Sequence, residues 1–415
     1  MAEATAITRA SHPHAGLCVA LLVLLGFVLG SSEFVVIGVE TQISDDLHVS
    51  LARTGELISV FALTYAVLTP ILALATGRFR RFPLLVVYTV VLNLGNLLMM
   101  VAPTFEVLLA SRVVIGAVSG ALLAVGITYI PELVEHRHVS MTIAIVYAAF
   151  SMAMVLSTSI GKMIAESFGW RGAMAAVFVV GLLASVAIVA CMPRSGATDE
   201  PATVREQLAL LRDPRVLCGM AIFVFGVGSV YVFYAFITPY LETVLGLSPV
   251  AASAVLMAYG GVCLASNLLS GWADARFGLK APAVVFPIQA LILLGIFMVG
   301  PNTVPGLVLV LGLALTMYIL STPCVSLFMS VATNEHPKAL TLAGSVEPMA
   351  FNVGIAFGTA VGGAVVAGPG MEYVGLVGSG FAMIACALVL VTLGLVRRSR
   401  VRRERAHGVA ESKPR

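Results

Sequence analysis

The chain has 415 residues, of which 59% are hydrophobic and 11% are charged, and its formal net charge is +3. Soluble domains carry about 25% charged residues. The composition therefore excludes a water-soluble globular protein and predicts an integral membrane protein. The six cysteines lie singly inside apolar runs, without the paired spacing of a disulfide framework or a metal site.

Twelve apolar segments follow one another along the chain, and each is long enough to cross a bilayer core of about 30 Å. The predicted spans are 17–41, 54–75, 82–101, 104–130, 139–164, 171–192, 215–241, 249–270, 281–300, 303–332, 339–367 and 374–396. We therefore expect an all-α membrane fold of two six-helix bundles. The expected parts are a tail (1–16), a first bundle (17–192), a linker (193–214), a second bundle (215–396) and a basic tail (397–415).

The two polar segments carry signals of their own. In the linker, Thr203 and Glu206 have the spacing of a capping box, which predicts a short amphipathic helix on the membrane surface. The basic tail after Val396 is expected to lie against anionic lipid headgroups rather than to bind nucleic acid.

The positive charges predict the orientation in the membrane. If the N-terminus is cytoplasmic, 20 of the 24 Lys and Arg residues fall on the cytoplasmic side. Only Arg53, Lys162 and Arg171 fall outside, and Arg112 lies within a span. Because Lys and Arg accumulate in cytoplasmic loops, both termini are expected to face the cytoplasm.

The two halves of the chain repeat one another. LATGRFRR at 74–81 lies between the second and third spans, and GWADARFG at 271–278 lies between the eighth and ninth, an offset of 197 residues between Leu74 and Gly271. Glycines recur at a similar distance, with Gly161 in the fifth span and Gly358 in the eleventh. Two repeated bundles with a binding site between them form a secondary-transporter architecture.

These motifs carry a family resemblance over essentially the whole chain. The two basic loops, RVVIGAVSGA at 112–121 and SFGWR at 167–171 resemble the major facilitator superfamily. Within it, the segments GSSEFVVIG, AMVLSTSIGKMIAESFGWR and FNVGIAFGTAVGG resemble sugar-efflux and arabinose-efflux permeases of the twelve-span drug:proton antiporter group. The resemblance implies proton-driven export of small organic molecules by alternating access, through a monomer in a bacterial-type inner membrane. No cofactor is implied beyond the proton gradient.

The resemblance also implies a cytoplasmic gate at the two basic loops. Its residues here are Thr76, Arg80 and Arg81 in the first loop and Asp274 and Arg276 in the second. Thr76 stands where the family usually has an aspartate, so Asp274 is expected to carry more of the gating than Thr76.

The fifth span departs from the family pattern as well. Ser157 and Ser159 replace the glycine and proline of the antiporter motif, while Gly161 is retained. The missing proline weakens the antiport assignment without excluding it.

Glu33 is the first candidate for proton coupling, because a carboxylate within a span is costly unless it faces a bundle interior or a wet cavity. Arg112 is expected at a similar depth, which allows a charge pair. The alternatives are that Glu33 snorkels to the outer interface or binds substrate directly, and that Arg112 only ties helices together through backbone carbonyls. Glu347 is the next carboxylate to consider.

A second set of residues is expected to line a substrate cavity. These residues offer an apolar ring with a hydroxyl, or an amide, for a small-molecule substrate: Tyr65, Tyr147, Tyr231, Tyr234, Tyr318 and Asn352. Packing or anchoring at the membrane interface is the alternative role for each tyrosine.

Other chemistries lack their motifs. The chain has no G-x-x-x-x-G-K-[ST] phosphate loop and no H-E-x-x-H. Within transport, uptake or uncoupled facilitation is the alternative to export, and a polytopic membrane enzyme or a sensor is the remote one. Sugars, thiogalactosides and amphenicols are the expected substrate types, with protons and membrane lipids as the other partners.

Overall fold

The computed structural model describes residues 14–76, 79–135, 138–194, 209–336 and 339–411. Within these ranges the secondary structure is helical, without strands. The predicted linker helix around Thr203 lies outside them. The fold is therefore the all-α arrangement expected from the apolar spans.

The first half contains seven helices in the described residues: α1 (Ala15–Gly38), α2 (Glu40–Asp46), α3 (Leu51–Thr76), α4 (Arg81–Val101), α5 (Phe105–Thr128), α6 (Ile130–Leu133) and α7 (Val139–Cys191). Helix α7 contains two of the predicted spans, because Gly169 has a φ of 72° and turns the chain back between them. Glycine populates positive φ without the steric cost that other residues meet.

The second half follows the linker. Its elements are α9 (Pro214–Tyr234), α10 (Ile237–Pro239), the π-helix η2 (Tyr240–Val244), α11 (Pro249–Phe277), α12 (Lys280–Val299), α13 (Thr303–Thr316), α14 (Ser321–Glu335), α15 (Leu340–Ala367), the 3-10 helix η4 (Met371–Tyr373) and α16 (Val374–Glu411). Eleven helical stretches in the described chain are long and apolar enough to cross a membrane, and the one in α7 is folded back at Gly169. The described residues therefore contain twelve candidate spans.

Three spans are interrupted where the sequence predicts continuous helices. The first ends at Gly38 rather than at 41, and the seventh ends at Tyr234 rather than at 241. Pro239 follows the second break, and proline disfavours helical continuation. The tenth is broken between α13 and α14, where the hydroxyl of Ser266 accepts a hydrogen bond from the Tyr318 amide at 3.0 Å. Side chains of α11 thus satisfy backbone groups that the interrupted helix leaves open.

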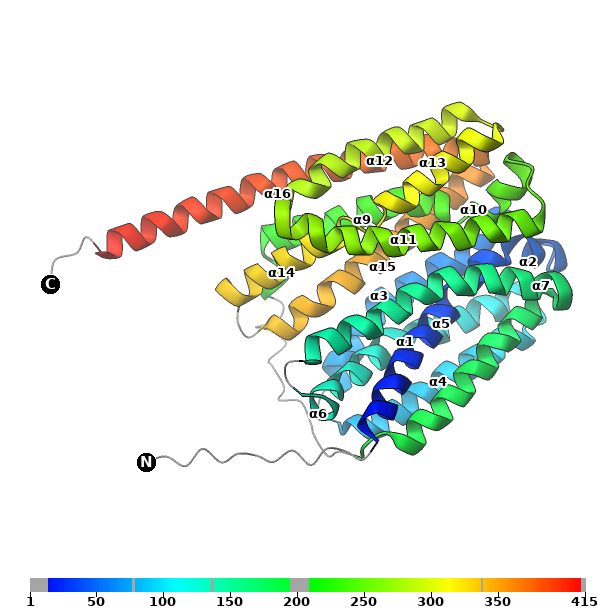
Figure 1. Cartoon of the computed structure of the whole chain (residues 1–415), viewed down its shortest axis with the longest axis horizontal. Coiled ribbons are helices and arrows are strands. Elements are labelled where there is room, and N and C mark those ends of the chain that lie inside the picture. Colours follow the sequence, from blue (N-terminus) through cyan, green and yellow to red (C-terminus); the bar gives the residue numbers. More distant parts are fainter. Residues whose placement is uncertain (1–13, 77–78, 136–137, 195–208, 337–338, 412–415) are drawn as a thin grey trace.

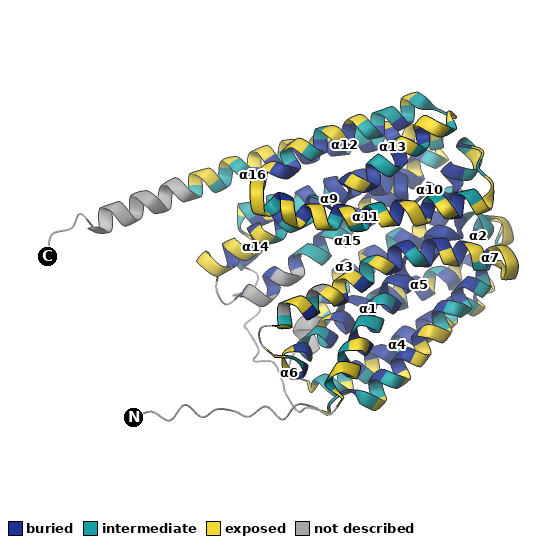
Figure 2. Cartoon of the chain, in the orientation of Figure 1, coloured by how far each residue is buried: buried dark blue, intermediate teal, exposed yellow. Residues whose placement is uncertain are grey.

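Each half has its own apolar core. One buried cluster runs from Cys18 to Met192, and the other from Leu210 to Val389. Phe34, Ile37 and Met154 of the first half belong to the second cluster, so the halves share buried apolar contacts. Many outward-facing side chains of the surrounding helices are exposed and apolar, which suits a lipid-facing surface (Figure 2).

Glycines allow several of these helices to cross closely. A Cβ atom on Gly30 of α1 would lie 2.6 Å from the Phe150 carbonyl oxygen of α7. One on Gly358 of α15 would lie 2.5 Å from the carbonyl oxygen of Gly228 in α9. Small residues permit such backbone approach between membrane helices, in agreement with the glycine spacing in the sequence.

The two ends of the bundle differ. One end, called the proximal end here, carries the start of α1 and the end of α16 (Figure 1). The opposite end, called the distal end, carries α2, α10, η2 and the bend of α7 at Gly169.

Candidate functional site

Glu33 faces the other half of the protein rather than lipid. Its residue is 3% exposed, and its Oε2 atom has no hydrogen-bond partner. It interacts electrostatically with Tyr231 and Tyr318 of the second half. Because Glu33 is enclosed between the halves, the snorkelling alternative is wrong.

Arg112 bonds backbone carbonyls in this conformation rather than the Glu33 carboxylate. Its guanidinium is fully buried and donates to three backbone carbonyls, those of Leu57 at 3.0 Å, Glu33 at 2.8 Å and Ser32. It also stacks over the Phe61 ring at 4.5 Å. The Arg112 guanidinium and the Glu33 carboxylate, both in the described part of the chain, form no ion pair with each other, although the two charges interact electrostatically.

Of the two roles considered for Arg112, these contacts correspond to tying helices together through backbone carbonyls. A carbonyl oxygen has two lone pairs, so these helical carbonyls accept from Arg112 as well as from the backbone. Arg112 fastens α5 to α1 and α3, and it places its charge beside Glu33 without binding the carboxylate.

Glu347 of the second half lies near the same tyrosines as Glu33. It is half-buried on α15 and interacts electrostatically with Tyr65, Tyr147 and Tyr318. One turn along α15, the Asn352 side chain donates to the Pro348 carbonyl at 3.0 Å, and its Oδ1 atom has no partner. The second half thus presents a carboxyl group and an open amide acceptor.

Predicted tyrosines from both halves lie close to Glu33 and Glu347. Tyr65 interacts electrostatically with Glu33, Tyr147 and Glu347, which join α1, α3, α7 and α15 at one place. The hydroxyl of Tyr318 also donates to the sulfur of Met154 across the two halves at 3.1 Å.

An aromatic cluster in the second half surrounds this region. Tyr231 packs edge-on against Tyr234 at 5.4 Å between ring centroids, and Tyr318 stacks on Phe351 at 5.8 Å. Tyr259, which the sequence did not single out, stacks on Tyr234 at 5.0 Å. The buried hydroxyl of Tyr231 has no hydrogen-bond partner. These rings offer apolar faces together with an open polar group.

The predicted gate residues contact their own halves. Arg80 is exposed before α4, while Arg81 donates to Thr128 at 3.1 Å and to Glu132 at 2.8 Å. Asp274 accepts from Ser326 at 2.6 Å, and Arg276 lies over the Phe277 ring. Thr76 ends α3, and its side chain is outside the described atoms. Their gating role remains a prediction.

The distal end holds the two halves together through a set of contacts that we call the distal seal, made by Ile37, Thr41, Lys162, Thr238 and Glu242. Thr238 donates to the Ile37 carbonyl at 2.7 Å. Thr41 donates to Glu242 at 3.3 Å, and Lys162 forms a short ion pair with the same carboxylate.

The sequence placed Lys162 among the external charges, but its side chain is 5% exposed. The missed signal is the matching Glu242, which lies 80 residues away, one residue beyond the predicted end of the seventh span. Lys162 is therefore a buried charge of the distal seal.

A second ion pair lies beside the seal within the first half. Asp46 accepts from Arg171 at 2.6 Å and from the Trp170 ring nitrogen at 2.9 Å. These hydrogen bonds lower the pKa of Asp46 below its ordinary value. The pair fixes the bend of α7 at Gly169 against the end of α2.

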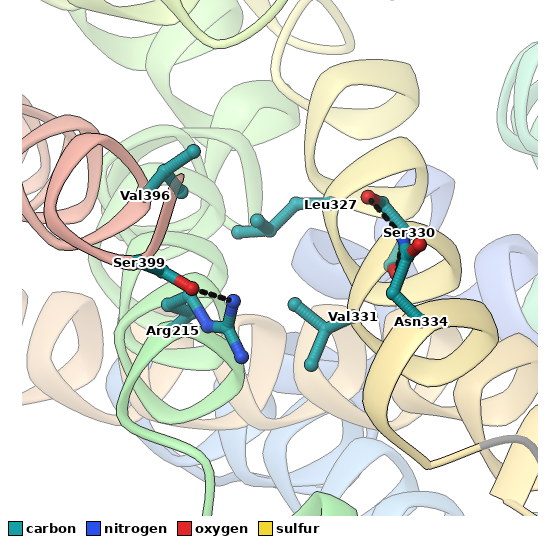
Figure 3. A pocket seen from close by; sticks show the side chains of 7 residues that line it. All are labelled: Arg215, Leu327, Ser330, Val331, Asn334, Val396 and Ser399. Atoms are coloured by element: carbon teal, nitrogen blue, oxygen red, sulfur yellow. Dashed lines mark hydrogen bonds between the residues drawn. The ribbon is translucent and has the colours of Figure 1, made fainter. Parts of the chain in front are cut away.

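A pocket of about 190 Å³ opens at the proximal end between α9, α14 and α16 (Figure 3). Arg215 points into it and donates to Ser399 at 2.8 Å, to Asp213 at 2.6 Å and to Glu335 at 2.5 Å. Burial alone would raise the pKa of Asp213, but the hydrogen bonds from Arg215 outweigh it and lower the pKa.

Asp213 and Glu335, with His336, also form the group of described residues that is spaced to hold a metal ion. The Arg215 guanidinium already bonds both carboxylates and supplies their counter-charge. The arrangement is therefore a clamp between helix ends rather than a metal centre.

Comparison with known proteins identifies relatives of this chain. A family model described as Major Facilitator Superfamily matches residues 22–347. The chain is 26% identical over 384 residues to the uncharacterized MFS-type transporter YtbD of Bacillus subtilis (strain 168), covering 92% of this chain and 96% of that protein. It is 27% identical over 372 residues to the inner membrane transport protein YdhP of Escherichia coli (strain K12), covering 89% and 94% of the two chains.

A solved structure shares the fold. It is the inward-facing and occupied conformation of a bacterial homolog to the human lysosomal transporter Spinster, with a TM-score of 0.77. The match covers 92% of this chain and 97% of that chain at 16% identity.

Proposed function

Because the chain belongs to the major facilitator superfamily and is a transporter, we propose that it exports a small organic molecule from the cytoplasm in exchange for protons. The observation that carries the proposal is Glu33, a carboxyl group buried between the two halves with an oxygen atom that has no hydrogen-bond partner. Buried, unpaired ionisable groups in membrane spans mark ion and substrate pathways.

The surroundings of Glu33 support proton exchange at this carboxyl group. An ionised carboxylate without a partner is strongly destabilised away from water, so the enclosed acid is most stable with a proton. If the halves move and water or a substrate group reaches Glu33, solvation or a hydrogen bond stabilises the ionised carboxylate, and the proton leaves. Arg112 adds a nearby positive charge that its three carbonyl contacts hold in place.

The neighbouring groups support a neutral, amphipathic substrate. The aromatic rings around Tyr231 and Tyr318 suit an apolar body, and the open acceptor of Asn352 suits a hydroxyl or an amide. Sugars, thiogalactosides and amphenicols combine these features. Glu347 supplies a second carboxyl group within electrostatic range of the same tyrosines.

Alternating access supports the same proposal. The distal seal joins the halves in this conformation, so the distal end is closed. A rocking motion that breaks the seal gives access to the shared region from the distal side. Export requires that the proximal end is cytoplasmic, as the distribution of positive charges favours.

The orientation is tested by cysteine labelling in a cysteine-free background. Cysteines at Ser50, Phe168 and Asn302 are expected to react with a membrane-impermeant maleimide in intact cells. Cysteines at Arg80 and Glu335 should react only after permeabilisation, because positively charged loops remain in the cytoplasm. Labelling of Arg80→Cys in intact cells, with Asn302→Cys protected, would reverse the assigned orientation.

The transport activity is tested with purified protein in liposomes under an imposed pH gradient. Radiolabelled lactose, isopropyl thiogalactoside and chloramphenicol are the probes. We expect at least one of them to accumulate in the acidic lumen of proteoliposomes, and a protonophore to abolish the accumulation. Equilibration that ignores the pH gradient indicates an uncoupled facilitator and contradicts antiport.

A further inference from the structure

A second carboxyl group, that of Glu40, lies buried without a partner beside the distal seal. The residue is 0% exposed, and neither carboxylate oxygen has a hydrogen-bond partner. It directly follows the break at Val39, where α1 ends and α2 begins. The function proposed above makes no use of this group.

Glu40 is fixed between two residues of the seal. Ile37, three positions earlier, accepts a hydrogen bond from Thr238 of the second half, and Thr41 donates to Glu242 of the second half. Closing the seal therefore encloses Glu40, because the chain on both sides of it is held against the other half.

Charged groups on the surrounding elements have other partners or are exposed. Helix α2 packs against α3, α7 and α10, and its neighbour Thr41 contacts η2. The titratable groups on α2, α3, α7 and η2 nearest this end are Asp45, Asp46, Arg53, Glu56, Lys162, Glu166, Arg171, Tyr240 and Glu242. Arg171 is bound to Asp46. Lys162 is bound to Glu242 and lies 3.8 Å from Glu166. Among the described groups, the one that interacts electrostatically with Glu40 is the phenol of Tyr234 on α9.

The closed seal therefore provides no charge to balance an ionised Glu40. Removing a carboxylate from water without a partner costs several kcal/mol in real proteins, and a proton is the smallest ligand that removes this cost. A metal cation needs several oxygen ligands at once. The adjacent hydroxyl of Thr41 donates its hydrogen bond to Glu242.

We propose that Glu40 is a second proton-binding site, distinct from Glu33, and that the distal seal closes only when this carboxyl group holds a proton. Opening the seal admits water to Glu40 and lets it ionise, so each closure takes up one proton from the distal side. The two equilibria are linked, since a ligand that binds one conformation shifts the population toward it. The inference goes beyond the proposed function, because it concerns closure of the seal and does not depend on coupling at Glu33.

The test measures the distance between the halves as a function of pH. Spin labels on cysteines at Ser50 of the first half and Val250 of the second are read by pulsed dipolar spectroscopy, in a cysteine-free protein in lipid nanodiscs. In the wild-type background, the ratio of the longer, open distance to the shorter, closed one is expected to rise with pH. One linked proton gives at most about a tenfold rise per pH unit. Glu40→Gln should stay closed over the same range.

Matched variants separate this result from other sources of pH dependence. Asp45→Asn changes an exposed carboxylate on the same helix and should leave the pH response intact. The comparison is repeated in a Glu33→Gln background, in which titration of Glu33 cannot contribute to the pH response. Glu40→Met is the second variant, because it also cannot ionise and gives a reading if Glu40→Gln does not fold. In the Glu33→Gln background, a pH response that persists in either Glu40 variant overturns the proposal, and so does a protein with native Glu40 that shows no pH response. An open fraction that depends on sodium at constant pH would assign the site to a metal cation instead.

The readout is a distance and not transport. Failure of pH-driven transport with an intact Glu40 response would reject only the proposed antiport. A missing Glu40 response with intact transport would reject only this inference.

Discussion

Glu33→Gln is expected to abolish accumulation driven by a pH gradient while substrate exchange without a gradient continues. Glutamine resembles the protonated acid in size and hydrogen bonding but cannot release a proton. The buried site should accept it readily, because the Glu33 residue is 3% exposed and its Oε2 atom has no partner to lose. Accumulation should fall to the level of empty liposomes, because glutamine cannot take up and release the proton that couples transport to the gradient.

The measurement compares gradient-driven uptake with counterflow exchange in the same proteoliposome preparation. Glu347→Gln is the control for the second carboxyl group of the region and is expected to lower the rate without uncoupling. If Glu33→Gln still concentrates substrate when the pH gradient is imposed, Glu33 is not the coupling group. Loss of both accumulation and exchange would instead indicate that Glu33 binds substrate directly.

Lys162→Met is expected to open the distal seal. The ammonium group is 5% exposed and pairs with Glu242, whose side chain is 17% exposed, so the substitution leaves a largely buried carboxylate with Thr41 as its remaining seal partner. Breaking a buried ion pair by removing one partner costs about 3 kcal/mol or more. This cost falls on the closed conformation, which corresponds to a rise of about 100-fold in the open-to-closed ratio.

The change is measured with the same spin-label pair at Ser50 and Val250, together with transport rates. The reversed pair Lys162→Glu with Glu242→Lys should recover part of the closed population. Arg53→Gln is the matched control, because its ion pair with Glu106 lies within the first half and both side chains are exposed. An unchanged distance distribution in Lys162→Met, with the protein folded, would show that the ion pair does not hold the seal.

The sequence determined the membrane-spanning architecture by itself. Apolar runs long enough to cross a bilayer have few alternatives, because backbone groups in lipid must bond within a helix. The repeated basic loops and the Glu33 segment then indicated the family, and Glu33 stood out because a carboxylate within a span is too costly to be incidental. Its burial between the halves agrees with that argument.

The tertiary structure decided which groups Arg112 and the seal residues contact. Matching depth allowed either a charge pair with the Glu33 carboxylate or contacts with backbone carbonyls, and the guanidinium bonds the Leu57 and Glu33 carbonyls. Depth along a helix can be counted from the sequence, but the rotation of each helix about its axis is set by packing against its neighbours.

The breaks in the helices and the contacts of the distal seal could not be predicted from the sequence for a related reason. Apolar runs predict where a span lies, but whether it stays helical at Val39 depends on partners supplied from elsewhere in the fold. Glu242 meets Thr41 across 201 residues and Lys162 across 80, so no local pattern marks the seal. In the sequence, Glu40 likewise resembles a polar residue at the end of a predicted span. Only the packing of the second half against this segment removes its carboxyl group from water.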